Sequence, residues 1–325
     1  MTSRKIVPFF YQIMNKISRV YRCQLKHLCG RVLGALKPNS FFRNPKLITA
    51  LWYMSQKGRI PHFSHPRNID EQLMANNLRA MNNEQERAIR IQCADKYAVR
   101  EYVRNKGFNH ILNNCFGVYR SVDEIDFDDL PDQFVLKLTN GCGQNFICRD
   151  KRQLDIASLK KTLHCWIDQA PFIGLKTGEW HYSQIEPRII AEEYLSFLDD
   201  GNSLIDYKFH CFNGNVLGVL VCYDRDPQTH LANYDWYDLE WNLTDGEPEE
   251  LHKNQRIIPK PASFNEMIKI VKALSSNIEY VRIDLYDING KPLFGEMTFT
   301  EGGNILVYNQ WVKDAMFHQL NQSRT

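Results

Sequence analysis

The segment VRIDLYDINGKPLFGEMT, residues 281–298, decides the fold of this 325-residue chain. Asn289-Gly290 separates two apolar runs and is a strong signal for a tight β-hairpin turn. Because side chains alternate along a strand, Arg282 and Asp284 share one face with Glu296 of the partner strand. Two facing carboxylates repel unless a cation lies between them, and hard oxygen ligands suit Mg²⁺. The segment therefore predicts metal and phosphate chemistry on a core hairpin; the alternative is a solvated face with an ordinary ion pair.

A glycine-rich segment follows another predicted strand upstream. The short apolar run 134–137 ends in Lys137, and Gly141 and Gly143 come shortly after it. Glycines let the backbone turn tightly so that its N–H groups approach phosphate oxygens, and the lysine adds a point charge. The Walker pattern GxxxxGK[ST] is absent, and the segment does not open a helix, because residues 146–148 continue as strand. A plain hairpin with a glycine bulge remains the alternative.

Further strands and hairpins indicate an α+β domain. The run 187–195 is an apolar strand that ends in two glutamates, and its backbone could hydrogen-bond an adenine edge. Residues 204–212 and 216–223 flank Asn213-Gly214, which predicts a second hairpin, and residues 264–275 are predicted to form a helix. Long hairpins with intervening helices are typical of α+β folds.

The cysteines and histidines give no sign of a disulfide framework or a zinc site. The nine cysteines are scattered without a CxxC pair, and the ten histidines form no HExxH pattern. This usage is typical of reduced thiols in the cytoplasm.

The charge distribution sets the N-terminal region apart. The first 67 residues hold 13 of the 40 lysines and arginines, and the first acidic residue is Asp70. Apolar residues recur at helical spacing over residues 1–40, which predicts an amphipathic helix, but no apolar run is long enough to span a bilayer. Such an arm could lie on an anionic membrane surface or pack on the rest of the protein. Nucleic acid is not expected, because no nucleic-acid module accompanies the charge.

The order of these motifs resembles the ATP-grasp superfamily. The wording of residues 187–195, 206–214, 281–286 and 294–300 is similar to the TupA-like ATP-grasp family, over about residues 69–319. The resemblance implies an α+β ATP-grasp fold, with two α+β subdomains gripping ATP, preceded by a basic helical N-terminal region. We therefore expect a basic arm over residues 1–40, a helical connecting region over 41–90 and the catalytic domain over 91–325.

The resemblance also implies the site residues and cofactors, ATP and Mg²⁺. Arg282 and Lys137 are the implied catalytic residues. Asp284, Glu296 and Thr298 are the implied metal ligands, although Thr298 stands where relatives carry asparagine. The implied nucleotide-binding residues are Arg100 (with Lys96 as the alternative), Lys137, Asn140, Gly141, Gly143, Asn145, Glu192, Glu193, Leu195, Asp206 and Lys208.

The activity that the resemblance implies is a carboxylate–amine ligase that works through an acyl phosphate. The implied acceptor is a glycan or sugar acid, such as a uronic acid of a bacterial surface polysaccharide. The enzyme would be cytoplasmic, with a peripheral position at the inner face of the membrane if the arm binds there. A sugar kinase, a non-catalytic binding protein and a glycosyltransferase remain as alternatives. For the last, Asp224-Arg225-Asp226 has the form of a metal-binding DxD segment, but its setting next to proline predicts a solvated turn.

Overall fold

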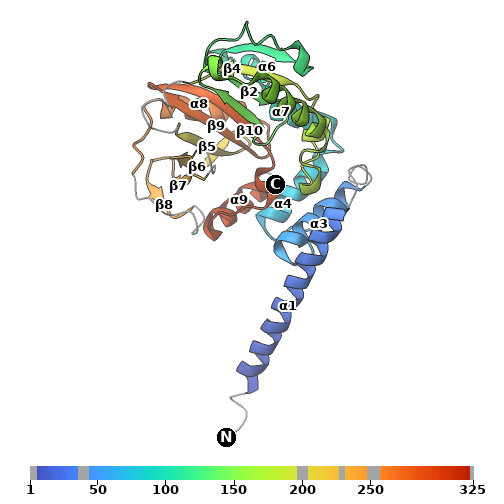
Figure 1. Ribbon diagram of the computed structural model, residues 1–325. Coiled ribbons are helices and arrows are strands. Elements are labelled where there is room, and N and C mark those ends of the chain that lie inside the picture. Colours follow the sequence, from blue (N-terminus) through green and yellow to red (C-terminus); the bar gives the residue numbers. More distant parts are fainter. Residues whose placement is uncertain (1–5, 36–43, 196–203, 227–230, 247–256, 323–325) are drawn as a thin grey trace.

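The computed structural model describes residues 6–35, 44–195, 204–226, 231–246 and 257–322, with the backbone alone for residues 6–20. Two α+β lobes stand above an N-terminal helical region (Figure 1). The helices are α1 (Ile6–Ala35), α3 (Pro45–Lys57), α4 (Ile69–Ala80), α5 (Glu84–Ala94), α6 (Val99–Asn105), α7 (Ile156–Gln169), α8 (Phe264–Leu274) and α9 (Gln310–Gln322). The strands are β1 (Cys115–Tyr119), β2 (Phe134–Leu138), β3 (Asn145–Cys148), β4 (Ile189–Glu193), β5 (Asp206–Phe212), β6 (Asn215–Tyr223), β7 (Asn233–Tyr237), β8 (Leu243–Thr244), β9 (Val281–Ile288) and β10 (Lys291–Thr298).

The first lobe is a four-stranded antiparallel sheet with the strand order β1-β4-β2-β3. Helix α7 packs its Leu159 and Leu163 against Phe134 and Leu136 of β2. The helix begins at Asp155, whose side chain accepts a hydrogen bond from the backbone N–H of Ser158 and so caps the helix. The predicted continuation of the glycine-rich segment as strand is confirmed by β3, which pairs with β2.

The second lobe is a six-stranded sheet with the order β10-β9-β5-β6-β7-β8. Both predicted hairpins are confirmed, β5–β6 and β9–β10. Their turns need positive φ at two successive positions, which Asn213-Gly214 and Asn289-Gly290 supply, with φ of 47° and 80° and of 54° and 76°. Helix α8, at the place predicted for it, covers one face of this sheet with an apolar side that includes Val271 and Leu274.

Between residues 69 and 105 the chain forms three helices, α4, α5 and α6. Asparagine caps the first two, because the side chains of Asn68 and Asn83 accept hydrogen bonds from the first turns of α4 and α5. The Asp70 carboxylate instead pairs with Lys57 at 2.6 Å and accepts from a backbone N–H of the last loop. The carboxylate of Asp95 caps the turn that leads into α6.

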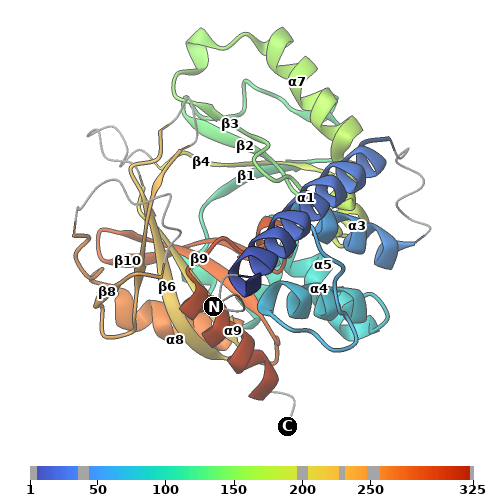
Figure 2. The ribbon, with the colours of Figure 1, turned by 90° about the horizontal axis from the view of Figure 1, so that it is seen from below.

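Helix α1 extends away from the two lobes as a long rod, and only its C-terminal part lies against α3 (Figures 1 and 2). There Cys29 and Leu33 of α1 are buried, and Leu33 forms a small separate core with Ile48 of α3 and Leu175. In the part of the chain that the structure describes, no helix is long and apolar enough to cross a membrane.

Candidate functional site

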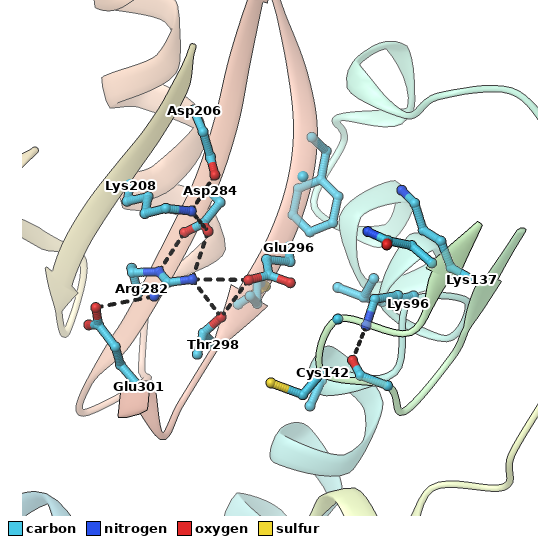
Figure 3. Close-up of a pocket in the computed structure, with 18 of the residues that line it drawn as sticks. Lys96, Lys137, Cys142, Asp206, Lys208, Arg282, Asp284, Glu296, Thr298 and Glu301 are labelled. Carbon is cyan, nitrogen blue, oxygen red and sulfur yellow. Dashed lines mark hydrogen bonds and ion pairs between the residues drawn. The ribbon is translucent and has the colours of Figure 1, made fainter. Parts of the chain in front are cut away.

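A cavity of about 730 Å³ lies between the two sheets. Figure 3 shows Arg282, Asp284 and Glu296 on one side of it and Lys96, Lys137 and Cys142 on the other. The predicted site residues that line the cavity are Arg100, Lys137, Gly141, Gly143, Asn145, Glu192, Leu195, Asp206, Lys208, Arg282, Asp284, Glu296 and Thr298. Residues that are far apart in sequence thus meet in one cavity.

Strand register builds the wall of the second lobe. Asp284 of β9 lies opposite both Lys208 of β5 and Glu296 of β10, so that the three side chains form one row across three strands. The register holds because β10 bulges at Gly295, where an added Cβ would meet the Asp284 carbonyl oxygen at 2.9 Å. A larger residue at this position would push the strands apart and move Glu296 out of the row.

Arg282 is the centre of this wall. Its guanidinium binds Asp284 with two hydrogen bonds of 2.7 and 2.8 Å, and it contacts Glu296 at 3.0 Å and Glu301 at 3.3 Å. Burial alone would raise the pKa of Asp284, but the nearby Arg282 and Lys208 outweigh it and hold that pKa below the ordinary value. Asp284 is therefore ionised at neutral pH, although only 1% of its surface is exposed.

Lys208 bridges two acids of the same wall. Its ammonium lies 2.5 Å from an Asp284 oxygen and also pairs with Asp206. Burial raises the pKa of Asp206 to about 6, an effect that Lys208 only partly offsets. One Asp206 oxygen, Oδ1, is buried without a hydrogen-bond partner in the described residues. A buried acceptor without a donor is costly, which makes this oxygen a candidate for contact with a ligand.

The first lobe supplies a wall of cations. Glu192 of β4 holds two of them, because one carboxylate oxygen lies 2.7 Å from the Lys137 ammonium and the other 3.3 Å from Arg100. The Lys96 ammonium donates to the carbonyl of Gly141 at 2.5 Å, in the glycine-rich loop. Burial and the nearby Lys137 lower the pKa of Lys96, whereas Glu296 opposes this shift. Both candidates for the first nucleotide-binding cation, Arg100 and Lys96, therefore line the cavity.

Two predicted nucleotide-binding residues lie elsewhere. Asn140 is fully buried, and its amide donates to the carbonyls of Ala170 and Tyr182, so that it fixes the path of the glycine-rich loop. The Glu193 side chain points away from Glu192, is exposed and accepts a hydrogen bond from Asn114. Neither of these two side chains is among the residues that line the cavity.

Sequence reasoning missed the acids at the far end of the cavity. Glu301 accepts from the hydroxyl of Tyr308, which also contacts the buried His210 at 3.3 Å. Glu179 is held by the hydroxyls of Thr177 and Thr300, and burial raises the pKa of its carboxyl. The one sequence signal was the glycine pair at 302–303, which marks a tight turn directly after Glu301.

The donor set fits a magnesium ion that is bound together with phosphates. In the described residues, no group of three or more His, Cys, Asp and Glu side chains could hold a metal on its own. Magnesium, however, commonly uses one or two carboxylates, with water and phosphate oxygens as its other ligands. The wall has a net charge of −2 when all its groups are ionised, because it combines Lys208 and Arg282 with four acids, Asp206, Asp284, Glu296 and Glu301. One buried oxygen of Glu301 has no hydrogen-bond partner in the described residues. Thr298 donates to Glu296 at 3.2 Å and so orients that carboxylate.

The two α+β lobes enclose a charged cavity between their sheets, with cations on one wall and acids around an arginine on the other. This arrangement defines an ATP-grasp fold. The model of the TupA-like ATP-grasp family matches residues 73–316, and the chain belongs to this family.

Solved structures of ligases show a more distant likeness. D-alanine–D-alanine ligase from Bacillus anthracis is 16% identical, with a TM-score of 0.42, over 71% of this chain and 66% of that one. L-amino acid ligase from Bacillus licheniformis is 14% identical, with a TM-score of 0.42, over 73% and 50%. The ATP-grasp ligase PsnB, solved with a minimal precursor, Mg and ADP, is 11% identical, with a TM-score of 0.38, over 84% and 67%. The chain spans between half and two thirds of the length of the first two. A comparison with curated proteins finds no match.

Proposed function

We propose that the protein is an ATP-dependent ligase that joins a carboxylate to an amine. The observation that carries the proposal is the cavity of about 730 Å³, in which a cationic wall from one lobe faces Arg282 and its acids from the other. A triphosphate needs the first wall, and a reacting carboxylate needs a cation close to the phosphate it attacks. The membership of the chain in the TupA-like ATP-grasp family supports this choice of nucleotide.

The nucleotide would bind along the first lobe. Lys137, Lys96 and Arg100 line that side, and the backbone N–H groups around Gly141 and Gly143 can approach phosphate oxygens. The chain just after Glu192 would meet the adenine, with Leu195 in the cavity wall. Asp284 and Glu296 would hold Mg²⁺, which neutralises charge on the phosphate oxygens when it is bound.

The reaction would proceed in two displacements. A carboxylate oxygen of the acceptor attacks the γ-phosphorus, the bond to the β-phosphate oxygen breaks, and an acyl phosphate and ADP form. An amine then attacks the acyl carbon and loses a proton, and inorganic phosphate leaves as the amide forms. Arg282 lies where it can stabilise the charge on the reacting oxygens, so that catalysis rests on positioning and electrostatics.

The acceptor would be a sugar acid, such as a uronic acid in a bacterial surface polysaccharide. This part of the proposal rests on the family to which the chain belongs. A glycosyltransferase finds no support at the DxD segment Asp224-Arg225-Asp226, because Arg225 lines the cavity while Asp224 and Asp226 are not among its lining residues.

A thermal-shift measurement tests the nucleotide assignment. We expect Mg·ATP to stabilise the folded protein by about 2.7 kcal/mol at a hundred times its Kd, because it binds the folded state alone. UDP-, GDP- and CDP-sugars at the same concentrations are the comparison ligands. Stabilisation by a nucleotide sugar, with none by Mg·ATP, would contradict the ligase and favour a glycosyltransferase.

We further propose that the enzyme works in the cytoplasm at an anionic membrane surface, to which the basic arm binds. The arm that the sequence predicted over residues 1–40 contains the buried Leu33, which packs against Ile48, so removing the arm whole would also disturb the fold. A deletion of residues 1–20 leaves that packing intact. We expect it to weaken binding to anionic vesicles in a flotation assay while ATP hydrolysis persists; unchanged vesicle binding would refute a role for those residues.

A further inference from the structure

A second, smaller cavity lies outside the proposed active site. It measures about 300 Å³ and lies between α1 and the segment 58–67 that follows α3. The two segments touch at Gly58, which has a φ of 66°, and an added Cβ there would meet the Arg22 carbonyl oxygen at 2.8 Å. Glycine at this position therefore lets the helix lie against the turn and close one side of the cavity.

The charge of this cavity is strongly positive. Its basic residues are Arg22 of α1 and Arg59, His62 and Arg67 of the facing segment. None of these four side chains has an ion pair with a carboxylate in the described residues. The one acid of the lining, Glu71, is only 1% exposed, and its two oxygens accept from the Tyr53 hydroxyl and the Arg67 backbone N–H, each at 2.9 Å. The cations are thus left without a neutralising partner.

One of the cations is already fixed in place. The Nε of Arg59 donates to the Tyr53 hydroxyl at 2.9 Å, and the guanidinium carbon lies 5.7 Å from the centre of the Tyr53 ring. The terminal nitrogens of the guanidinium have no partner in the described residues. A guanidinium that keeps two parallel N–H donors free matches the geometry of a phosphate group, and little side-chain entropy remains to be lost on binding.

Helix α1 adds an apolar stripe next to this cavity. Tyr21, Leu28 and Val32 are 61%, 53% and 39% exposed, and their spacing of seven and four residues places them on one side of the helix. Tyr21 also lines the cavity, so the stripe begins there. Arg22, Lys26 and Arg31 are exposed on the same helix, and α1 contains no acidic residue. Apolar and cationic side chains without acids are the pattern of a helix that lies at a membrane surface.

We propose that this cavity binds the phosphate of an anionic lipid headgroup, while Tyr21, Leu28 and Val32 rest on the apolar part of the membrane interface. The proposal extends the membrane-surface role of the arm, but it rests on residues 21–67 and not on residues 1–20. It is independent of the ligase activity. A specific headgroup site would fix the height and orientation of the enzyme over the membrane, which a diffuse basic arm cannot do.

Vesicle flotation of the full-length protein tests the site. The vesicles are pure phosphatidylcholine or phosphatidylcholine with a third of phosphatidylglycerol, at fixed ionic strength. The test variant is R22Q/R67Q, and the matched control is K26Q/R31Q, which removes the same charge from exposed positions outside the cavity. Diffuse attraction alone predicts equal losses of roughly 30-fold for either pair, because each charge contributes about 1 kcal/mol, or about fivefold in affinity.

We expect R22Q/R67Q to lose at least ten times more affinity for the anionic vesicles than K26Q/R31Q, with no binding of any variant to pure phosphatidylcholine. Equal losses in the two double variants, or no binding of the wild type, would overturn the proposal. The deletion of residues 1–20 separates the arm from the cavity, because it leaves the cavity complete. If that deletion alone abolishes binding and R22Q/R67Q binds as the control does, the cavity has no role.

Two further measurements keep the result unambiguous. Inorganic phosphate is the probe for a soluble ligand. If phosphate, but not sodium chloride, stabilises the wild type and the protein binds no vesicles, the cavity binds a free phosphate compound, and the lipid proposal is overturned.

Melting temperatures and the response to Mg·ATP report on folding. If R22Q/R67Q unfolds, the single variant R22Q, at an exposed helix position, replaces it and K26Q becomes its control.

Discussion

Replacing Glu296 by glutamine is expected to lower ATP turnover by at least about 100-fold while the melting temperature stays close to that of the wild type. The Glu296 side chain is 44% exposed, and one of its oxygens accepts from both Arg282 and Thr298. Glutamine keeps the shape and that acceptor but removes the charge that faces the phosphates and the metal. A coupled assay of ADP release, with a thermal melt of the same preparation, measures both effects.

The control for this variant is Glu101→Gln, which removes one charge from an exposed position on α6 outside the cavity. We expect it to retain wild-type turnover. Normal activity of Glu296→Gln would remove Glu296 from the metal site. Equal losses of activity in both variants would show that overall charge, and not the position of Glu296, matters.

Asp284 is a poorer residue for the same test, although it is the other proposed carboxylate ligand of the metal. Asp284 is 1% exposed and is bound by both Arg282 and Lys208. Its replacement by asparagine leaves two buried cations side by side, so that lost stability and lost activity would be confounded. Asp284 and Glu296 face each other but differ in how much stability their neutralisation costs, because Asp284 is buried. The alternation of residues along a strand does not predict this difference in burial.

Local signals in the sequence were sufficient for the hairpins and for the row of charged residues across them. The Asn-Gly turn fixes the register near it and so brings Asp284 close to Glu296. The two residues pair directly only because of the bulge at Gly295, since an unbroken register would place Asp284 opposite Gly295. Lys208 joins that row through the pairing of β5 with β9, strands that lie more than seventy residues apart. The residues of neither strand predict that the two strands pair. The sequence indicated this pairing only through the resemblance to a family.

The far end of the cavity could not be predicted for the same reason. Glu179 lies in a loop with no periodic pattern, and its neighbours are Thr177 and Thr300, one of them from the other end of the domain. Likewise Asn140 matched a motif position, but the carbonyls that hold its amide come from Ala170 and Tyr182. Contacts of this kind depend on how the loops cross, which no spacing of residues encodes.

Arg282→Met is expected to destabilise the protein by about 3–5 kcal/mol and to remove turnover, because one side chain neutralises three acids. The guanidinium contacts Asp284, Glu296 and Glu301, and the loss of one positive charge changes the wall from a net charge of −2 to −3. Arg282→Lys keeps the charge, but a single ammonium cannot replace a fork that binds Asp284 twice, so we expect it to recover part of the stability and little of the turnover. Urea unfolding, with Arg104→Met as an exposed control, measures the difference.

The stability that Arg282→Met loses should be largest near neutral pH and should decrease as the pH falls. Burial favours the neutral form of Glu301, but Arg282 outweighs it and lowers the pKa of Glu301 below its ordinary value. In the wild type this carboxylate therefore contributes stability above the pKa of the unfolded chain, and that contribution disappears as the pH falls through the lower folded value. Without Arg282 the ionised acid is buried unpaired at pH 7, whereas its protonated form needs no cation. The difference in the free energy of unfolding between wild type and Arg282→Met should be largest near neutral pH and should become smaller toward pH 4. A difference that grows on acidification would show that Arg282 stabilises the wall by packing and not by charge.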